Sequence, residues 1–348
     1  MNSPLRIGLI VHADRQHGVA QYARALADRV VAASAHADTS TATVLERGGS
    51  EASDLRDDTD PTPVHAHFTD RLWGPNPGDA AAAIERIARR TTCTVTLHDV
   101  PQPSDGRSLE ARIAGYQRVV DAAAGIVVNS EHERLLLADV IDLGDTPVTV
   151  IPLPVEVAHE SAGDPAPSLA DAPVLDPAVA ILGFFYPGKG HREVVDAVAA
   201  ARVDAPVRAL GRVSDGHEAD LAELESHARA LGVDFAVTGY LDSDELVRQC
   251  RRVAVPVIAH THFSASGSMA TWIGAGRRPI VVESRYAREM EHLRPGTLTI
   301  VSAADLGAAV ARAISDPVST RVAADADTRP HPDDTVAAYR AWWAEVAS

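Results

Sequence analysis

The sequence predicts an α/β protein with two doubly wound, Rossmann-like domains that face each other across a cleft. Short apolar runs alternate with segments of helical period along most of the chain, which is typical of parallel sheets joined by crossover helices. The length of 348 residues is sufficient for two domains of ordinary size. Residues 159–177 are rich in Pro, Ala and Asp and follow neither period, so we interpret them as an interdomain linker.

The first domain, residues 1–158, is expected to form one parallel sheet with helices between its strands. Its short apolar runs predict strands at 6–12, 42–45, 64–68, 93–97, 125–129 and 148–151. Apolar residues at helical spacing predict helices at about 19–35, 78–90, 109–124 and 131–140. Acidic residues, glycines and serine make 46–60 a loose surface loop.

The second domain, residues 178–328, restarts the same alternation. Strands are expected at 178–185, 207–210, 235–238, 253–258, 279–282 and 297–301. Helices are expected from His191 onward and at 215–231, 243–251, 268–276 and 303–315. A polar break at 316–332 then precedes a last amphipathic helix at 333–346.

Composition and charge limit the kinds of function. The formal net charge of −16 argues against a broad nucleic-acid surface and against docking on anionic lipid, although it is compatible with a local basic pocket. The only cysteines, Cys93 and Cys250, lie far apart and outside any CxxC pattern, so we expect them to be reduced and buried. No apolar run reaches the roughly 18 residues that span a bilayer. The N-terminus shows no signal peptide, and a cytoplasmic location is expected.

One lysine, Lys189, occurs in the whole chain, and every other basic side chain apart from histidine is an arginine. It follows an apolar strand and a Pro/Gly turn and precedes an amphipathic helix. Such a turn presents backbone N–H groups and a lysine to phosphate oxygens. A compact ammonium also fits a tight phosphate pocket better than the wide guanidinium fork. The alternative is chance retention on a surface loop. The spacing does not match GxxxxGK[ST], so the sequence does not predict a P-loop NTPase.

A second candidate site lies at 262–268, after the strand at 253–258 and at the start of a helix. Ser266, Gly267 and Ser268 are small enough for close backbone approach, and the helix N-terminus offers unpaired N–H groups. These residues suit a diphosphate. The alternative is that Ser266 or Ser268 only caps the helix.

Four histidines, His12, His65, His67 and His98, fall at or near strand ends. We expect His98 at the mouth of the sheet, where it could hydrogen-bond a sugar hydroxyl or a leaving oxygen with a pKa near neutrality. For His65 and His67 we prefer structural hydrogen bonds, because no carboxylate stands at a spacing suited to a metal. Gly18, in the turn after the first strand, either approaches a ligand or is an ordinary turn glycine.

Together these segments resemble the retaining glycosyltransferases of the GT-B fold, in particular the family-four type. In the first half the similar segments are the Gly18 turn, 64–67, 96–99 and 127–130. In the second half they are Gly183 with Lys189 and Gly190, 238–241, 244–246 and 275–279. The segment 329–348 is similar to the C-terminal helix of that family, which returns to the first domain.

The resemblance implies transfer of a sugar from a nucleotide-diphosphate sugar to a small or lipid-linked acceptor, without metal or other cofactor. It implies diphosphate binding by Lys189, Gly190, Ser266, Gly267, Ser268 and Gly18. It implies a nucleobase or ribose site at Gly239, Tyr240 and Leu241. His98 would be the catalytic residue that contacts the transferred sugar near the reacting carbon. No nucleic-acid partner is implied, and the oligomeric state is not predicted.

Two departures from the family pattern bear on activity. The usual glutamates, seven residues apart, are replaced by Ser264 and Thr271 or by Ala265 and Trp272, and Phe184 replaces the usual arginine. Losing a carboxylate that accepts sugar hydroxyls changes sugar or nucleotide preference. Ser264 and Glu289, or Glu283, would then be possible sugar-binding residues. Two alternatives stay open: a non-catalytic sugar-nucleotide-binding protein of this fold, and a nucleotide-sugar epimerase, which needs acid and base carboxylates.

Overall fold

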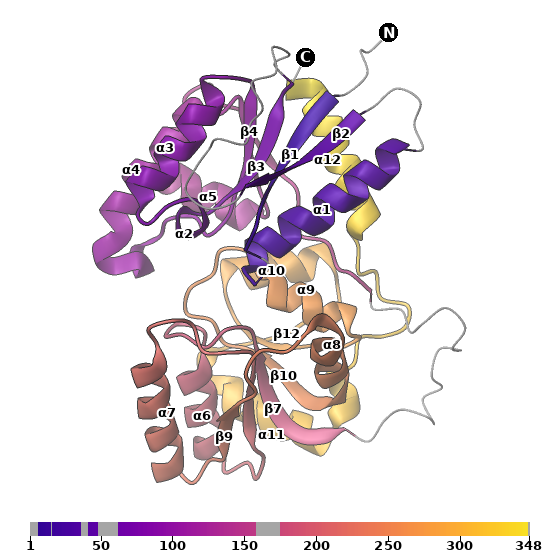
Figure 1. Ribbon diagram of the computed structural model, residues 1–348. Coiled ribbons are helices and arrows are strands. Elements are labelled where there is room, and N and C mark those ends of the chain that lie inside the picture. Colours follow the sequence, from indigo (N-terminus) through magenta and orange to yellow (C-terminus); the bar gives the residue numbers. More distant parts are fainter. Residues whose placement is uncertain (1–5, 15, 36–40, 48–61, 158–174, 347–348) are drawn as a thin grey trace. The chain divides into compact units, whose positions relative to one another are not determined.

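The computed structural model describes residues 6–14, 16–35, 41–47, 62–157 and 175–346 (Figure 1). Two compact units make up the chain. Unit 1 holds the residues up to Pro154 and those from Pro332 onward, and unit 2 holds Val155–His331. Most of the expected linker and most of the expected 46–60 loop lie outside the described residues.

Unit 1 contains a six-stranded parallel sheet in the order β2-β1-β3-β4-β5-β6. Its strands are β1 Arg6–His12, β2 Thr41–Arg47, β3 Val64–Phe68, β4 Cys93–Leu97, β5 Gly125–Val128 and β6 Val148–Val150. All the expected strands are present. β2 extends beyond the expected end, and its Glu46 lies opposite Val11 of β1 in the sheet register, so this residue belongs to the sheet and not to a loop.

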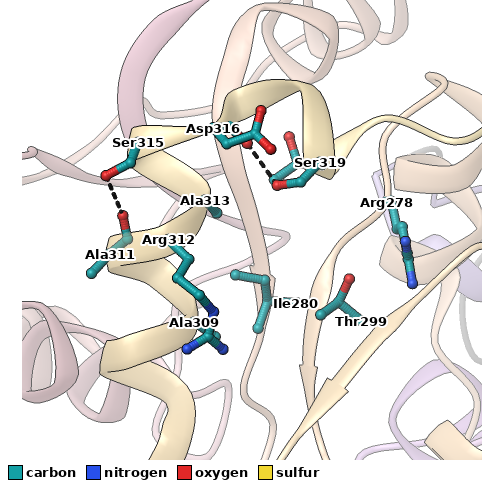
Figure 2. Close-up of a pocket in the computed structure, with 11 residues that line it drawn as sticks. Arg278, Ile280, Thr299, Ala309, Ala311, Arg312, Ala313, Ser315, Asp316 and Ser319 are labelled. Atoms are coloured by element: carbon teal, nitrogen blue, oxygen red, sulfur yellow. Dashed lines mark hydrogen bonds between the residues drawn. The ribbon is translucent and has the colours of Figure 1, made fainter.

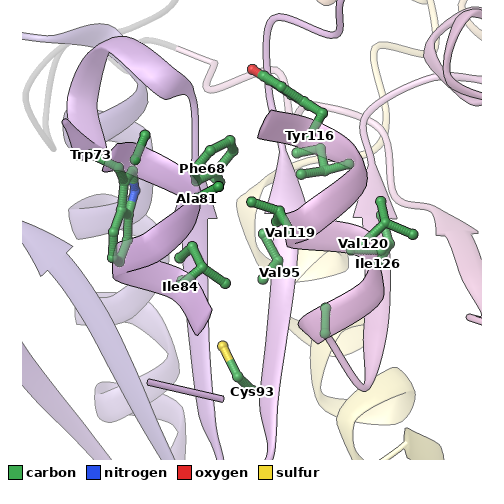
Figure 3. Packing of buried hydrophobic residues seen from close by; sticks show 14 of the residues in the cluster. Phe68, Trp73, Ala81, Ile84, Cys93, Val95, Tyr116, Val119, Val120 and Ile126 are labelled. Atoms are coloured by element: carbon green, nitrogen blue, oxygen red, sulfur yellow. The ribbon is translucent and has the colours of Figure 1, made fainter. Parts of the chain in front are cut away.

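The helices of unit 1 are α1 Gly18–Ala35, α2 Asp70–Trp73, α3 Pro77–Ala88, α4 Leu109–Ala122, α5 Glu131–Val140 and α12 Pro332–Val346, with the 3-10 helix η1 Pro103–Ser108. The short α2 and η1 were not expected, because each is too brief to show a helical period. Figure 3 shows part of the core beside α3 and α4, where Ile84, Val95, Tyr116 and Val119 are fully buried. Burial of these apolar side chains is what drives the helices onto the sheet.

The C-terminal helix α12 belongs to unit 1. Val336, Tyr339, Trp342 and Trp343 are buried in one cluster with side chains of β1 and α1. The chain therefore leaves unit 1 after Pro154 and returns to it from Pro332 onward.

Unit 2 contains a second six-stranded parallel sheet in the order β12-β11-β10-β7-β8-β9. Its strands are β7 Asp176–Leu182, β8 Val207–Leu210, β9 Phe235–Val237, β10 Val253–Ile258, β11 Ile280–Val282 and β12 Thr299–Val301. β7 begins inside the expected linker and ends before Gly183. The φ of +114° at Gly183 breaks the extended chain there.

The helices of unit 2 are α6 His191–Ala200, α7 Glu218–Ala230, α8 Ser243–Arg252, α9 Gly267–Gly274, α10 Arg285–Leu293 and α11 Leu306–Ser315, with 3-10 helices η2 Ala303–Asp305 and η3 Pro317–Thr320. The sequence prediction missed α10, although its signal is present. Ser284 caps it by accepting from the Ala287 N–H at 3.0 Å, and Tyr286, Ala287 and Met290 form its buried face.

Each sheet is parallel throughout, and its strand order reverses once. The reversal lies between β1 and β3 in unit 1 and between β7 and β10 in unit 2. These are the topological switch points of two doubly wound domains, so the predicted fold class is confirmed. The cleft between the domains stays a prediction. Both cysteines are buried free thiols, as expected.

Candidate functional site

The loops that follow β7 and β10 meet at the switch point of unit 2. The backbone N–H and the hydroxyl of Thr261 both donate to the Gly188 carbonyl, at 3.0 and 3.3 Å. A Cβ on Gly190 would lie 2.2 Å from the carbonyl oxygen of Ala259, and Gly190 has a φ of +91°. Only glycine permits this approach. Ligands of doubly wound sheets bind at such a point, beyond the carboxyl ends of the strands.

Lys189 projects back over the end of β7. Its Cε and Nζ both lie 3.1 Å from the position that a Cβ on Gly183 would take, so the glycine makes room for the lysine. Within the described part of the chain the ammonium has no hydrogen bond and no carboxylate partner. Burial lowers the pKa of Lys189 to about 8. A half-buried cation without a counterion is suited to an anionic ligand.

Two histidines lie close to this lysine. His191, the first residue of α6, is 2% exposed and packs against Phe185 with ring centroids 4.8 Å apart. In the described part of the chain neither of its ring nitrogens has a hydrogen-bond partner, and burial followed by the Lys189 charge lowers its pKa to about 3. His260 follows β10. Burial, with further contributions from Lys189, His191 and His262, holds its pKa well below the ordinary value. No acidic side chain of the described residues contributes to the pKa of Lys189, His191 or His260.

The N-terminus of α9 lies in the loop that follows β10. Ser266 is the cap: its Oγ accepts from the Met269 N–H at 3.3 Å, and its own N–H donates to the Tyr286 hydroxyl at 3.0 Å. The Ser266 side chain is buried, whereas Gly267 is exposed. Among the described residues, the N–H groups of Gly267 and Ser268 have no partner. Ser266 therefore caps the helix, while the N–H groups of the next two residues are available to an anion.

The loops after β8 and β9 complete the edge of unit 2. The Gly211 N–H donates to Thr238 Oγ1 at 3.0 Å, which ties the two loops together. Gly239 has a φ of +81°, and the Tyr240 side chain after it is 54% exposed, while Leu241 packs on the unit 2 core. The exposed ring of Tyr240 lies next to Gly239, which has no side chain, so a flat aromatic ligand could stack on the ring.

The candidate sugar-binding residues are spread more widely. Ser264 is buried in the loop after β10, Glu289 is half-buried on α10, and Glu283 pairs with Arg288 at 2.7 Å. The Thr271 hydroxyl donates to the Gly267 carbonyl at 3.0 Å, so it serves α9 itself. Within α9 and the loop before it, the described residues include no carboxylate that could take the place of the two glutamates usual in the family.

In unit 1, His98 follows β4 and pairs with His67 at the end of β3. His67 Nδ1 and His98 Nε2 are 3.0 Å apart, and the two rings stack at 5.3 Å. The ring of Tyr22 from α1 meets both imidazoles edge-on. The expected near-neutral pKa of His98 is wrong: burial, together with the charge of His17, lowers it to about 3. His98 is therefore a neutral hydrogen-bonding group.

His65 makes the structural hydrogen bonds that the sequence analysis preferred, and His67 bonds to the candidate residue His98. His65 is held by Thr94 Oγ1 and Thr96 Oγ1, each at 2.9 Å. The Thr96 hydroxyl is also 2.8 Å from the Tyr339 hydroxyl of α12. His67 faces the same side of the sheet as His65, but it contacts His98, which lies beyond the strand and could not be paired with it from spacing alone.

A buried arginine that the sequence analysis did not single out holds the loop after β4. The Arg112 side chain is 6% exposed and forms ion pairs with three carboxylates, Asp70 at 3.2 Å, Asp99 at 3.1 Å and Asp105 at 2.6 Å. Asp99 has a φ of +53°, which is unusual for a residue other than glycine. The Tyr116 hydroxyl donates to the His98 carbonyl at 2.7 Å. These contacts fix the backbone that carries His98.

Gly18 is the first residue of α1, and a Cβ there would meet nothing within 4 Å. Its neighbour His17 accepts from the Val19 N–H through Nδ1 at 3.2 Å and so caps the helix. The fold of unit 1 therefore does not itself require glycine at position 18, and its approach to a donor stays a prediction.

A cavity of about 670 Å³ opens at the other end of the unit 2 sheet (Figure 2). It is bounded by the starts of β11 and β12 and the end of α11, opposite the edge that carries Lys189. Two of its hydroxyls are used within the helices, since Ser315 donates to Ala311 at 3.1 Å and Ser319 to Asp316 at 2.6 Å. It shares no residue with the predicted site.

No protein-family model and no curated protein sequence matches this chain. Solved structures do. HepE from Anabaena in complex with UDP and glucose is 14% identical with a TM-score of 0.71, covering 98% of this chain and 100% of HepE. Sucrose-phosphate synthase from Thermosynechococcus elongatus is 16% identical with a TM-score of 0.66, covering 99% and 96%. The lipopolysaccharide outer core galactosyltransferase WaaB is 14% identical with a TM-score of 0.56, covering 95% and 93%. The chain has the GT-B fold that these glycosyltransferases share. In the described residues, no helix is both long and apolar enough to cross a bilayer.

Proposed function

We propose that the protein is a glycosyltransferase that moves a sugar from a nucleotide-diphosphate sugar to a small or lipid-linked acceptor. We further propose retention of anomeric configuration, independence from metal ions and a cytoplasmic location. The shared GT-B fold supports the reaction class. The observation that carries the proposal is Lys189, a half-buried ammonium at a switch point with no counterion among the described residues.

The donor diphosphate would be bound by Lys189, Gly190 and the backbone N–H groups of Gly267 and Ser268. α6 and α9 both begin in the two loops that meet here, so two helix N-termini contribute positive partial charge. Ser266 would support this site as the cap of α9. Exposed Tyr240, with Gly239 and Leu241, would form the nucleobase side, and its ring would stack on the base.

In transfer, the bond between the anomeric carbon and the diphosphate breaks, and its electron pair stays on the leaving phosphate. The acceptor oxygen then bonds to the anomeric carbon in place of the phosphate, and the proton of the acceptor hydroxyl passes to a phosphate oxygen. Negative charge then develops on the leaving phosphate, so a cation and amide dipoles fixed nearby lower the barrier. Lys189 supplies that cation, which is why we propose that no metal is required. His98 would contact the sugar near the reacting carbon, where its neutral ring donates or accepts one hydrogen bond. His67 would set which nitrogen of His98 carries the proton.

A second candidate function is sugar-nucleotide binding without transfer. The specific observation behind it is that α9 has no carboxylate to accept hydrogen bonds from sugar hydroxyls. The Thr271 hydroxyl, at one of the positions where the family has a glutamate, instead donates to a carbonyl within α9. An epimerase needs paired acid and base groups, and the site residues described above provide none in unit 2.

The test is donor turnover. UDP-, GDP- and ADP-sugars would be incubated with the protein, with and without EDTA, and release of nucleoside diphosphate measured alongside a panel of acceptors. The HepE complex makes UDP-glucose the first donor to try. Release that persists in EDTA and is lost in Lys189→Met supports the transferase. Tight binding with neither hydrolysis nor transfer would favour the binding protein, and the anomeric proton of any product reports retention.

A further inference from the structure

Three basic side chains of unit 2 come together with no carboxylate among them. Lys189 and His191 belong to the turn after β7 and the start of α6, and His260 belongs to the loop after β10. The hydrogen bonds from Thr261 to the Gly188 carbonyl hold the two loops against each other, so the three groups are neighbours across the switch point. The described part of the chain places no acidic side chain where it affects the pKa of any of the three.

Of the two histidines, His260 is the one placed to respond to a ligand. His191 is 2% exposed and lies among Phe185 and Phe235, which leaves no path to an anion. His260 is only partly buried. Its ring packs against Phe263 with ring centroids 4.9 Å apart and the planes tilted by 38°. Among the described residues neither of its nitrogens has a hydrogen-bond partner. The ring therefore has two unused polar atoms beside the lysine.

The charge balance at His260 reverses when a diphosphate arrives. In the free protein Lys189 and desolvation both disfavour the imidazolium, so the ring is neutral. A diphosphate diester brings two negative charges to the lysine. Those charges favour a protonated ring, and an imidazolium N–H makes a charge-assisted bond to a phosphate oxygen.

We propose that His260 is a second ligand of the donor diphosphate, which takes up a proton when the anion binds and releases it when the anion leaves. The inference rests on the proposed function, because it requires a diphosphate beside Lys189. It makes the affinity for the donor increase as the pH falls below neutrality. His260 would also be positively charged only while the diphosphate is bound. The half-buried site of the free protein therefore does not hold two positive charges, on Lys189 and His260, at the same time.

The experiment is titration calorimetry with UDP-glucose at pH 6.5 in two buffers that differ in ionisation enthalpy, which gives the number of protons taken up. UDP-glucose suits this test because its diphosphate diester does not titrate near pH 6.5. With a pKa of about 8, Lys189 is already about 97% charged at this pH and contributes almost nothing. We expect the wild type to take up about half a proton or more per site. His260→Gln should take up almost none and bind several-fold more weakly. The matched control, His292→Gln on the exposed last turn of α10, should keep the wild-type uptake.

The outcomes separate the two proposals. Binding without proton uptake in the wild type, or uptake that persists in His260→Gln, overturns the role of His260 and leaves the transferase proposal standing. Failure of the wild type to bind any nucleotide sugar overturns both. If His260→Gln does not fold, His260→Asn and ¹³C-histidine NMR of the wild type replace it. A His260 Cε1 signal that stays at its neutral position on saturation with UDP-glucose would then contradict the proposal.

Discussion

Replacing Lys189 by Met removes the ammonium and keeps an unbranched side chain of similar length over Gly183. A hydrogen bond to a charged group contributes about 1.5–3 kcal/mol, so affinity for a nucleoside diphosphate should fall roughly 10- to 150-fold. The wild type should also lose affinity above pH 8. With a pKa of about 8 the lysine is about nine-tenths charged at pH 7 and about one-tenth charged at pH 9. UDP-glucose should therefore bind about tenfold more weakly at pH 9.

The assay exploits the absence of any other lysine in the chain. Reductive methylation with ¹³C-formaldehyde labels Lys189 and the α-amino group only, and it preserves the charge. NMR titration of the Lys189 signal should give a pKa near 8 in the free protein and a higher value with UDP-glucose bound. Each unit of increase corresponds to 1.36 kcal/mol of preference for the charged lysine. Equal affinity at pH 7 and pH 9, or an unchanged affinity in Lys189→Met, would refute the phosphate role.

Three further changes test other parts of the site. His98→Ala should lower turnover about tenfold, the effect of one lost hydrogen bond, with little change in donor Kd; an equal loss in both would contradict a sugar-side role. Gly190→Ala should lower the free energy of unfolding by about 2 kcal/mol or more, because its Cβ would lie 2.2 Å from a carbonyl oxygen at a φ of +91°; unchanged urea unfolding would contradict this packing. Acid should destabilise the protein, because the pKa values of His65, His98 and His191 are about 3 when folded and about 6.5 when unfolded. The unfolded chain then binds more protons, so stability present above pH 6.5 falls by about 2 kcal/mol per histidine at pH 5. Urea unfolding at pH 7 and pH 5 measures this, and equal midpoints would contradict it.

The parallel sheets could be predicted because central strands such as β1 and β10 are buried on both faces and appear as largely continuous apolar runs. The position of Lys189 could also be predicted, since a turn between a buried strand and a helix falls at the carboxyl edge of a parallel sheet wherever it occurs. α10 could have been found from its Ser284 cap and its apolar face. Its arginines and glutamates, however, made the segment resemble a polar loop.

The pairing of His67 with His98 and the three carboxylates around Arg112 could not be predicted. They depend on which strands are neighbours. β3 lies beside β4 in a register that sets His67 opposite Thr96, and only this register brings the residue after β4 within reach. Arg112 reaches its partners from a helix, across distances in sequence that carry no periodic signal. The spacing of residues along the sequence therefore predicts which residues lie at the carboxyl edge of a sheet, but it does not predict which of them contact each other.

The Lys189 site of unit 2 is unusual in a chain with 48 acidic residues. Arginines of the same unit pair with carboxylates at short distances, such as Arg208 with Asp234 at 2.6 Å and Arg192 with Glu223 at 2.5 Å. Lys189, which is half-buried, has no such partner among the described residues. Burying a cation without an anion costs free energy, which the protein reduces by keeping the neighbouring histidines neutral. The buried ammonium therefore destabilises the free protein, and a ligand that supplies the missing negative charge removes this effect. We accordingly expect Lys189→Met to be as stable as the wild type, or more stable, in the absence of nucleotide.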